Sequence, residues 1–425
     1  MGVQEAGSEQ ADCTSSGLGD QGLSKLALSV LREGDVGRLR AWFTREFDDE
    51  GVPRRLPVGS WISCLRQLAQ LRAGLGSAWT DDLDAFVERF FLLVLRFMRP
   101  DGSMVFGEPG CEEGRGELMS RWAEVLSQPG FQTVLNWWFP KKLGEYASPP
   151  LPAWSGTRAA LAALRADWLK TGSFISIDHR QPSLTSNVEW IGQGRSWLGP
   201  TWTFGATAEK VSQPRPITAI TNSAGDYLEW SVRAQGLTLA RSALILRGRR
   251  LALLADQVEG GSGMGETRIA LPGNVEVLPA MENRSVSLSQ GPRIAPARVI
   301  PLAIPRSIEN EQTGALRCEG GQLVLRQPIK GRRTWFPLLL SWEPARNRKT
   351  LNWQKLTVTE QSRICAEQTA VAFRVGWGRD ESLVVYRSLE RPATRSFLGY
   401  RTDARFLVGL FNRAGNVEPL LKVKS

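Results

Sequence analysis

Histidine is almost absent from this chain of 425 residues, which has only one, His179. A single histidine cannot build a metal site of several imidazoles within one chain, and any catalytic serine–histidine pair would depend on this residue. The five cysteines lie far apart and form no C-x-x-C pair, so neither a disulfide framework nor a cysteine zinc site is expected. Free thiols suit a reducing compartment, and we expect a cytoplasmic protein.

Long apolar runs are also missing. The most apolar segment, residues 86–98, is interrupted by Glu88, Arg89 and Arg96, and no run reaches the roughly 18 residues that a membrane span needs. We therefore expect no membrane segment. Residues 1–20 are polar and slightly acidic, which is typical of a disordered tail and unlike a secretory signal.

Several sequence motifs of known chemistry are absent. The chain has neither a G-x-x-x-x-G-K-[ST] phosphate loop nor a G-x-S-x-G nucleophile motif. Acidic residues form no convincing cluster, so neither a metal ion nor a cofactor is predicted, and the alternative is a calcium or other site built from carboxylates alone.

Positive charge is in excess. Lysine and arginine total 53 against 43 acidic residues, a net charge of +10. Such an excess favours an anionic partner, and the alternative is solvated charge with no partner. No nucleic-acid-binding module is recognised, so nucleic acid is not the expected partner.

The pattern of apolar residues changes near residue 173. Before it, apolar side chains recur at helical spacing, and Ser155 and Gly172 are placed as the N-cap and the stop of the last predicted helix. The predicted helices cover residues 22–47 (with a break at Gly34), 58–76, 80–98, 112–128 and 155–172. We therefore expect a helical domain over residues 21–172.

Residues 173–425 carry strand signals rich in Val, Ile, Leu and aromatic residues, repeated every 10 to 15 residues. This predicts a large antiparallel β-sandwich of stacked sheets, larger than an immunoglobulin-type module. The segment 240–260 is predicted to be a hairpin whose turn is Arg247-Gly248-Arg249-Arg250. Its second strand is apolar on both faces, which indicates that both faces are covered, and Asp256 is placed beyond the core, near water or an arginine.

Four stretches give this layout a resemblance to the heparinase II/III-like family of polysaccharide lyases, in which an α/α-toroid precedes a β-sandwich. They are 226–260, 176–202, 397–423 and the helix-to-hairpin connection "RFMRPDGSMVFG" at 96–107. The resemblance covers residues 173–425 best. It implies an α+β multidomain protein with a partial toroid, which acts on or binds an acidic polysaccharide.

Two departures from the family bear on activity. The helical part is short for a toroid, and the chain has one histidine and four tyrosines where the family's lyases use both residue types in a groove. We therefore expect a carbon–oxygen lyase whose β-elimination is reduced or lost. The alternative is a non-catalytic intracellular scaffold or accessory protein that retains the sandwich.

The resemblance also implies which chemistry to look for. Eliminating a uronate requires a group that neutralises the carboxylate, a base for the adjacent C–H proton and an acid for the leaving oxygen. His179, at the end of the strand "FISID", is the candidate base or neutralising group, and Tyr227 is the candidate acid. The alternatives are a loop histidine without a chemical role and a tyrosine packed on a sheet.

Tryptophan is abundant, with 16 residues, and indole faces stack on sugar rings. The stretch "WIGQGRSWLGPTWTFG" (190–205) contains glycine and proline and is predicted to be a loop, and loops often carry function. The predicted substrate-binding residues are Trp190, Arg195, Trp197 and Trp202, with Asn187 and Arg241. Core packing is the alternative for the tryptophans, and a structural ion pair is the alternative for Arg241.

Overall fold

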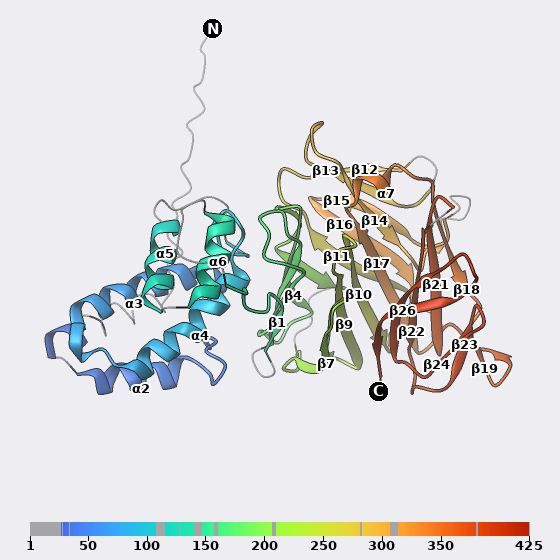
Figure 1. Cartoon of the computed structure of the whole chain (residues 1–425). Helices are drawn as coiled ribbons and strands as arrows, with labels where there is room; N and C mark the ends of the chain where they lie inside the picture. The colour runs from blue at the N-terminus through green and yellow to red at the C-terminus, as the bar shows by residue number, and fades with distance from the viewer. Residues whose placement is uncertain are drawn as a thin grey trace, which may run out of the picture. The chain divides into compact units, whose positions relative to one another are not determined.

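Figure 1 shows the computed structural model of the chain, which divides into two compact units, Met1–Val94 and Leu95–Ser425. The structure describes residues 27, 29–33, 35–107, 115–126, 128–139, 147–156, 160–205, 210–280, 283–306, 313–379 and 381–424. The tail predicted for residues 1–20 lies outside this part. Among the described residues, no helix is both long and apolar enough to span a bilayer.

The first unit is helical, as predicted. Its helices are α2 (Val36–Glu46), α3 (Trp61–Leu75) and the greater part of α4 (Asp81–Phe97). The break expected near Gly34 is explained by Asp35, whose carboxylate caps α2 by accepting a hydrogen bond from the Arg38 N–H at 3.1 Å. Helix α4 begins with three acidic residues in its first turn, where the helix dipole favours negative charge.

The second unit begins with the end of α4 and with two more helices, α5 (Arg115–Val125) and α6 (Pro129–Trp138). Helix α5 matches the prediction, whereas α6 was missed. The helix predicted for residues 155–172 is wrong, because β1 (Trp154–Ser155) and β2 (Leu161–Arg165) are strands there. All five residues of β2 are buried, and a short apolar run buried on every side has no periodicity that separates a helix from a strand.

The sandwich consists of four sheets, and every strand pairing in the described part is antiparallel. This confirms the predicted fold class. The first sheet has nine strands in the order β1-β2-β3-β4-β6-β11-β16-β15, with β5 paired to β4. Its further strands are β3 (Phe174–Asp178), β4 (Thr185–Gly192), β5 (Arg195–Leu198), β6 (Thr201–Phe204), β11 (Met264–Ala270), β15 (Ala315–Glu319) and β16 (Gln322–Pro328).

The second sheet has eight strands in the order β12-β13-β14-β17-β10-β9-β8-β7. They are β7 (Arg215–Thr221), β8 (Gly225–Ala234), β9 (Leu237–Leu246), β10 (Leu251–Glu259), β12 (Glu276–Pro279), β13 (Val286–Ser289), β14 (Ala297–Pro301) and β17 (Arg333–Ser341). Residues 190–205 belong mostly to β4, β5 and β6, so the loop predicted there is wrong. Alternating burial in β6, with Trp202 and Phe204 inside, favours a strand over a loop.

The third sheet has the order β18-β21-β22-β25-β26 and the fourth the order β20-β19-β23-β24. The third comprises β18 (Leu351–Leu356), β21 (Ala370–Trp377), β22 (Glu381–Ser388), β25 (Phe406–Phe411) and β26 (Val417–Val423). The fourth comprises β19 (Thr359–Glu360), β20 (Arg363–Ile364), β23 (Arg395–Phe397) and β24 (Tyr400–Thr402). The short helix α7 (Pro344–Asn347) lies between β17 and β18 in the chain.

The second sheet is a middle layer. Side chains from one of its faces share a core with the first sheet, and those from the other face share a core with the third. This confirms that the strand following Arg250 is covered on both faces, and the turn at residues 247–250 lies where it was predicted. The expectation for Asp256 is partly wrong, because this carboxylate is fully buried and pairs with Arg241 without reaching water.

Candidate functional site

His179 follows β3 directly and is held in place by its own backbone, since its N–H donates to the Ala160 carbonyl at 3.0 Å. Its imidazole stacks on Trp230 with ring centroids 4.6 Å apart and is only 4% exposed. Neither ring nitrogen has a hydrogen-bond partner among the described residues. Burial lowers the pKa of His179 to about 3, and the nearby charge of Arg241 acts in the same direction. A base this weak accepts protons poorly at neutral pH.

Tyr227 lies in β8 and is buried as well. Its hydroxyl donates to Glu229 at 2.9 Å and accepts from Arg387 at 3.1 Å, and its ring stacks on Phe406 with centroids 4.6 Å apart. Burial and then the Glu229 carboxylate raise the pKa of Tyr227 well above its ordinary value. The phenol is therefore a structural hydrogen-bond donor in the core between the second and third sheets.

The structure does not bring the two predicted catalytic residues together. Side chains alternate along β8, so Tyr227 faces the third sheet whereas Trp230 faces the first. His179 stacks on Trp230 and so lies on the opposite face of the sheet from Tyr227. No single substrate in this structure could meet both side chains.

Arg241 is buried in the core between the first and second sheets. Its guanidinium donates to Asp256 at 2.9 Å, to the Ser186 hydroxyl at 2.8 Å and to the Leu184 carbonyl at 2.6 Å. These bonds join β9 and β10 of the second sheet to the first sheet. The interaction observed for Arg241 is thus an ion pair inside the fold, which was the alternative to its predicted role in substrate binding.

Asp256 completes this network from the other side. Besides Arg241, it accepts from the Trp202 indole N–H at 3.0 Å and from the Thr267 hydroxyl at 2.7 Å. The guanidinium of Arg241 also lies over the Trp202 ring, 4.9 Å from the centroid. A carboxylate with these three donors is well compensated for its loss of water.

The other predicted binding residues fall into two groups. Trp190, Trp197 and Trp202 are fully buried, so they have no ring face exposed to a ligand in this structure. Asn187 and Arg195 are exposed, but they lie near opposite ends of β4, with Arg195 paired to Gly192. Five residues of extended strand separate the two positions by about 17 Å. The six side chains therefore do not line one common site.

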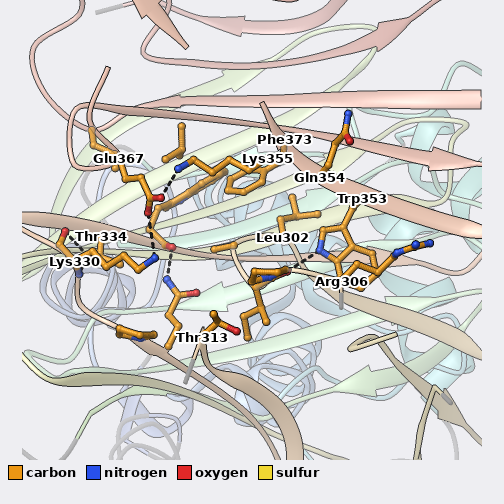
Figure 2. Close-up of a pocket in the computed structure, with 18 of the residues that line it drawn as sticks. Leu302, Arg306, Thr313, Lys330, Thr334, Trp353, Gln354, Lys355, Glu367 and Phe373 are labelled. Carbon is orange, nitrogen blue, oxygen red and sulfur yellow. Dashed lines mark hydrogen bonds and ion pairs between the residues drawn. The ribbon is translucent and has the colours of Figure 1, made fainter. Parts of the chain in front are cut away.

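A cavity of about 340 Å³ lies elsewhere in the second unit and was not predicted from the sequence. Figure 2 shows this cavity, which we call the basic cavity. Its wall comes from segments of the first, second and third sheets and the connections between them. Its lining residues include the cationic Arg306, Lys330, Arg333 and Lys355, the aromatic Trp335, Trp353 and Phe373, and the polar Gln327 and Glu367.

The charged part of the basic cavity consists of two lysines that share one carboxylate. Lys330 and Lys355 both point to Glu367 in Figure 2, and the Lys330 ammonium is 3.6 Å from its carboxylate. Burial alone would raise the pKa of Glu367, but hydrogen bonding to Lys355 and the charges of both lysines hold it below its ordinary value. Glu367 is therefore charged at neutral pH, and the cavity remains cationic because two lysines share this one carboxylate and Arg306 also lines the wall. Arg333 pairs with Glu259 and Glu390.

Two residues that line the basic cavity, Gln327 and Trp335, each carry a buried polar atom without a hydrogen-bond partner among the described residues. The Gln327 amide N–H donates to the Trp335 carbonyl at 2.7 Å, which leaves Gln327 Oε1 without a hydrogen-bond partner among the described residues. The indole Nε1 of Trp335 is also unpaired, and both side chains are at least 95% buried. Buried polar atoms are normally hydrogen-bonded, so these two unpaired atoms are an unfavourable feature of this part of the core.

Comparisons with known proteins show a likeness of fold. No family model matches the sequence, and no curated protein is found as a relative. The solved heparan sulfate lyase HepC of Pedobacter heparinus is similar, with a TM-score of 0.64 at 13% identity over 83% of this chain and 61% of the lyase. A mutant of HepC has a TM-score of 0.63 at 14% identity, over 84% of this chain and 62% of the mutant. A heparinase III structure has a TM-score of 0.62 at 10% identity, over 83% of this chain and 62% of that structure.

The chain thus has a heparinase-like fold, a short helical part followed by large antiparallel sheets. The predicted resemblance is confirmed as a distant structural relation. The chain spans about three fifths of the length of these solved structures. Sequence identities of 14% or less show a shared fold and do not show a shared activity or substrate.

Proposed function

We propose that this chain binds an acidic polysaccharide, and that the basic cavity is where it does so. The single observation that carries the proposal is the group of Lys330, Lys355 and Arg306 on the wall of one cavity, on a lyase-like fold. Lysine and arginine neutralise carboxylates or sulfates, and the side chains of Lys330 and Lys355 are 58% and 43% exposed to such a group. The volume of the basic cavity, about 340 Å³, lies within the range of ligand pockets.

Binding is proposed in preference to cleavage. Elimination needs a base and an acid on the same substrate, and His179 and Tyr227 lie in different cores with perturbed pKa values that disfavour proton transfer. We therefore propose no β-elimination by His179 and Tyr227. The fold likeness to heparan sulfate lyases makes a sulfated or unsulfated uronate polymer the first ligand to test.

The test measures binding and cleavage in parallel. Calorimetry with the full chain would be run against heparan sulfate oligosaccharides and a neutral glucan of equal length, while ultraviolet absorbance follows unsaturated uronate. We expect binding of the uronate oligosaccharide alone. Replacing both Lys330 and Lys355 by glutamine should weaken it about tenfold, which corresponds to about 1.4 kcal/mol.

The matched control is Lys422→Gln. Lys422 in β26 also pairs with one carboxylate, Asp403, but does not line the basic cavity. Its replacement should leave affinity unchanged. If no acidic polymer binds, the proposal fails and the non-catalytic scaffold is favoured. A rise in absorbance with the wild-type chain would show cleavage and would overturn the preference for binding alone.

A further inference from the structure

Glu367 occupies the position in the basic cavity that a ligand's anionic group would take. Its carboxylate pairs with Lys330 and Lys355, and it is the only acidic partner that either lysine has among the described residues. We propose that Glu367 is an internal competitor, which a carboxylate or sulfate of the bound saccharide displaces from the two lysines. This inference rests on the proposed function and specifies how the same site is occupied.

The exposure of Glu367 makes the displacement feasible. Its side chain is 47% exposed, and those of Lys330 and Lys355 are 58% and 43% exposed. Ion pairs exposed to this degree are weak, because water solvates the separated charges well. The carboxylate can therefore move into solvent when another anion takes its place.

The backbone on either side of Glu367 is held by a hydrogen bond from the Thr369 N–H to the Ala366 carbonyl at 2.9 Å. The side chain of the next residue, Gln368, accepts a hydrogen bond from the Arg332 N–H at 2.8 Å. The displacement therefore needs movement of the Glu367 side chain and no rearrangement of this turn.

The test compares Glu367→Gln with the wild-type chain. Glutamine keeps the size and one acceptor oxygen but removes the competing charge. Calorimetry at low salt with a heparan sulfate tetrasaccharide should show affinity about three- to tenfold higher for the variant, since a partly exposed ion pair no longer has to be broken. Without ligand, the variant should melt at a lower temperature than the wild type, and the tetrasaccharide should raise its melting temperature by more.

Control variants and ligands separate the outcomes. Asp403→Asn, which removes the carboxylate of the remote Lys422 pair, should leave affinity unchanged. A desulfated tetrasaccharide distinguishes carboxylate from sulfate as the displacing group, and cellotetraose should not gain affinity in the variant. If the wild type binds and Glu367→Gln binds equally or more weakly, the inference is overturned while the proposed function stands. If neither protein binds, both are overturned.

Discussion

The imidazole of His179 stacks on the indole of Trp230 at 4.6 Å, in a core where neither ring nitrogen meets a described hydrogen-bond partner. Protonation would place a charge in this core, where the cost of burial outweighs the attraction of Asp178 and Arg241 adds repulsion. Folding therefore favours the neutral form of the His179 imidazole over the protonated form. This arrangement has a measurable consequence for stability.

We expect the free energy of unfolding to fall as the pH drops below about 6.5, the ordinary pKa of histidine. The unfolded chain takes up a proton that the folded chain, with a His179 pKa of about 3, does not. This contribution is fully present at neutral pH and is lost progressively in acid. At pH 5 the loss of unfolding free energy, relative to neutral pH, should amount to about 2 kcal/mol.

Urea denaturation at pH 5 and pH 7 checks this, with His179→Phe as the matched variant that keeps a ring on Trp230. The variant should lose the part of the pH dependence due to histidine, whereas carboxylates affect both proteins alike. Because the chain has one histidine, its imidazole proton resonance needs no assignment and should not titrate between pH 5 and 8. Equal pH dependence in the two proteins would contradict the prediction.

Removing the charge of Glu229 should destabilise the sandwich strongly. Glu229 accepts from Arg387 at 2.6 Å and from Arg405 at 2.5 Å, and it is fully buried. Glu229→Gln leaves Arg387 buried without its counterion, which typically costs about 3–5 kcal/mol. Tyr227→Phe removes one hydrogen bond to the same carboxylate and should cost about 1.5–3 kcal/mol. Chemical denaturation measures both losses of stability. Equal losses in Glu229→Gln and Tyr227→Phe would contradict the assignment of Glu229 as the counterion of Arg387.

Gly199 should resist substitution. Its φ of +129° disfavours any side chain, and a Cβ there would approach the Val188 carbonyl oxygen to 2.5 Å. Gly199→Ala should therefore lower the free energy of unfolding by well over 1 kcal/mol, because the steric collision adds to the cost of placing alanine at a positive φ. Gly248 in the basic turn also has a positive φ, +68°, but open space around it, so Gly248→Ala is the control and should cost about 1 kcal/mol. Thermal melting of both variants tests the order.

Salt should weaken binding at the basic cavity. Screening shortens the range of charge interactions from about 10 Å at 0.1 M to about 3 Å at 1 M ionic strength. The affinity for a heparan sulfate oligosaccharide should fall steadily over this range, and the variant with both lysines replaced should show a shallower slope. Calorimetry at four salt concentrations provides the measurement. Affinity that is independent of salt would mean that the cations of the cavity are not used.

The sequence predicted the order of helices followed by antiparallel sheets because strand periodicity and turn residues are local signals. It failed at β2, where "LAALR" has strong helix formers and lacks the alternation of a half-buried strand. Pairing with β1 and β3 outweighs that propensity. Because the strand is buried on both faces, its alanines and leucines show no alternation that would predict a strand from the sequence.

The site was harder to predict than the fold. Rare residues drew attention to His179 and Tyr227, yet the structure uses both inside cores. The basic cavity joins Lys330, Lys355 and Glu367, which lie up to 37 positions apart and meet only when sheets pack. The run "KGRR" before β17 was a visible signal of its cationic wall, but nothing in the sequence connects this run to Glu367.

The middle sheet has consequences for how the polypeptide can be divided. A fragment ending before Leu351 would retain β8 and β10 but lose the layer that covers their leucines and neutralises Glu229. Such a fragment would aggregate and form inclusion bodies, because it would expose a large apolar surface and a carboxylate without its counterion. Recombinant work on this protein should therefore keep the sandwich whole through its last strand.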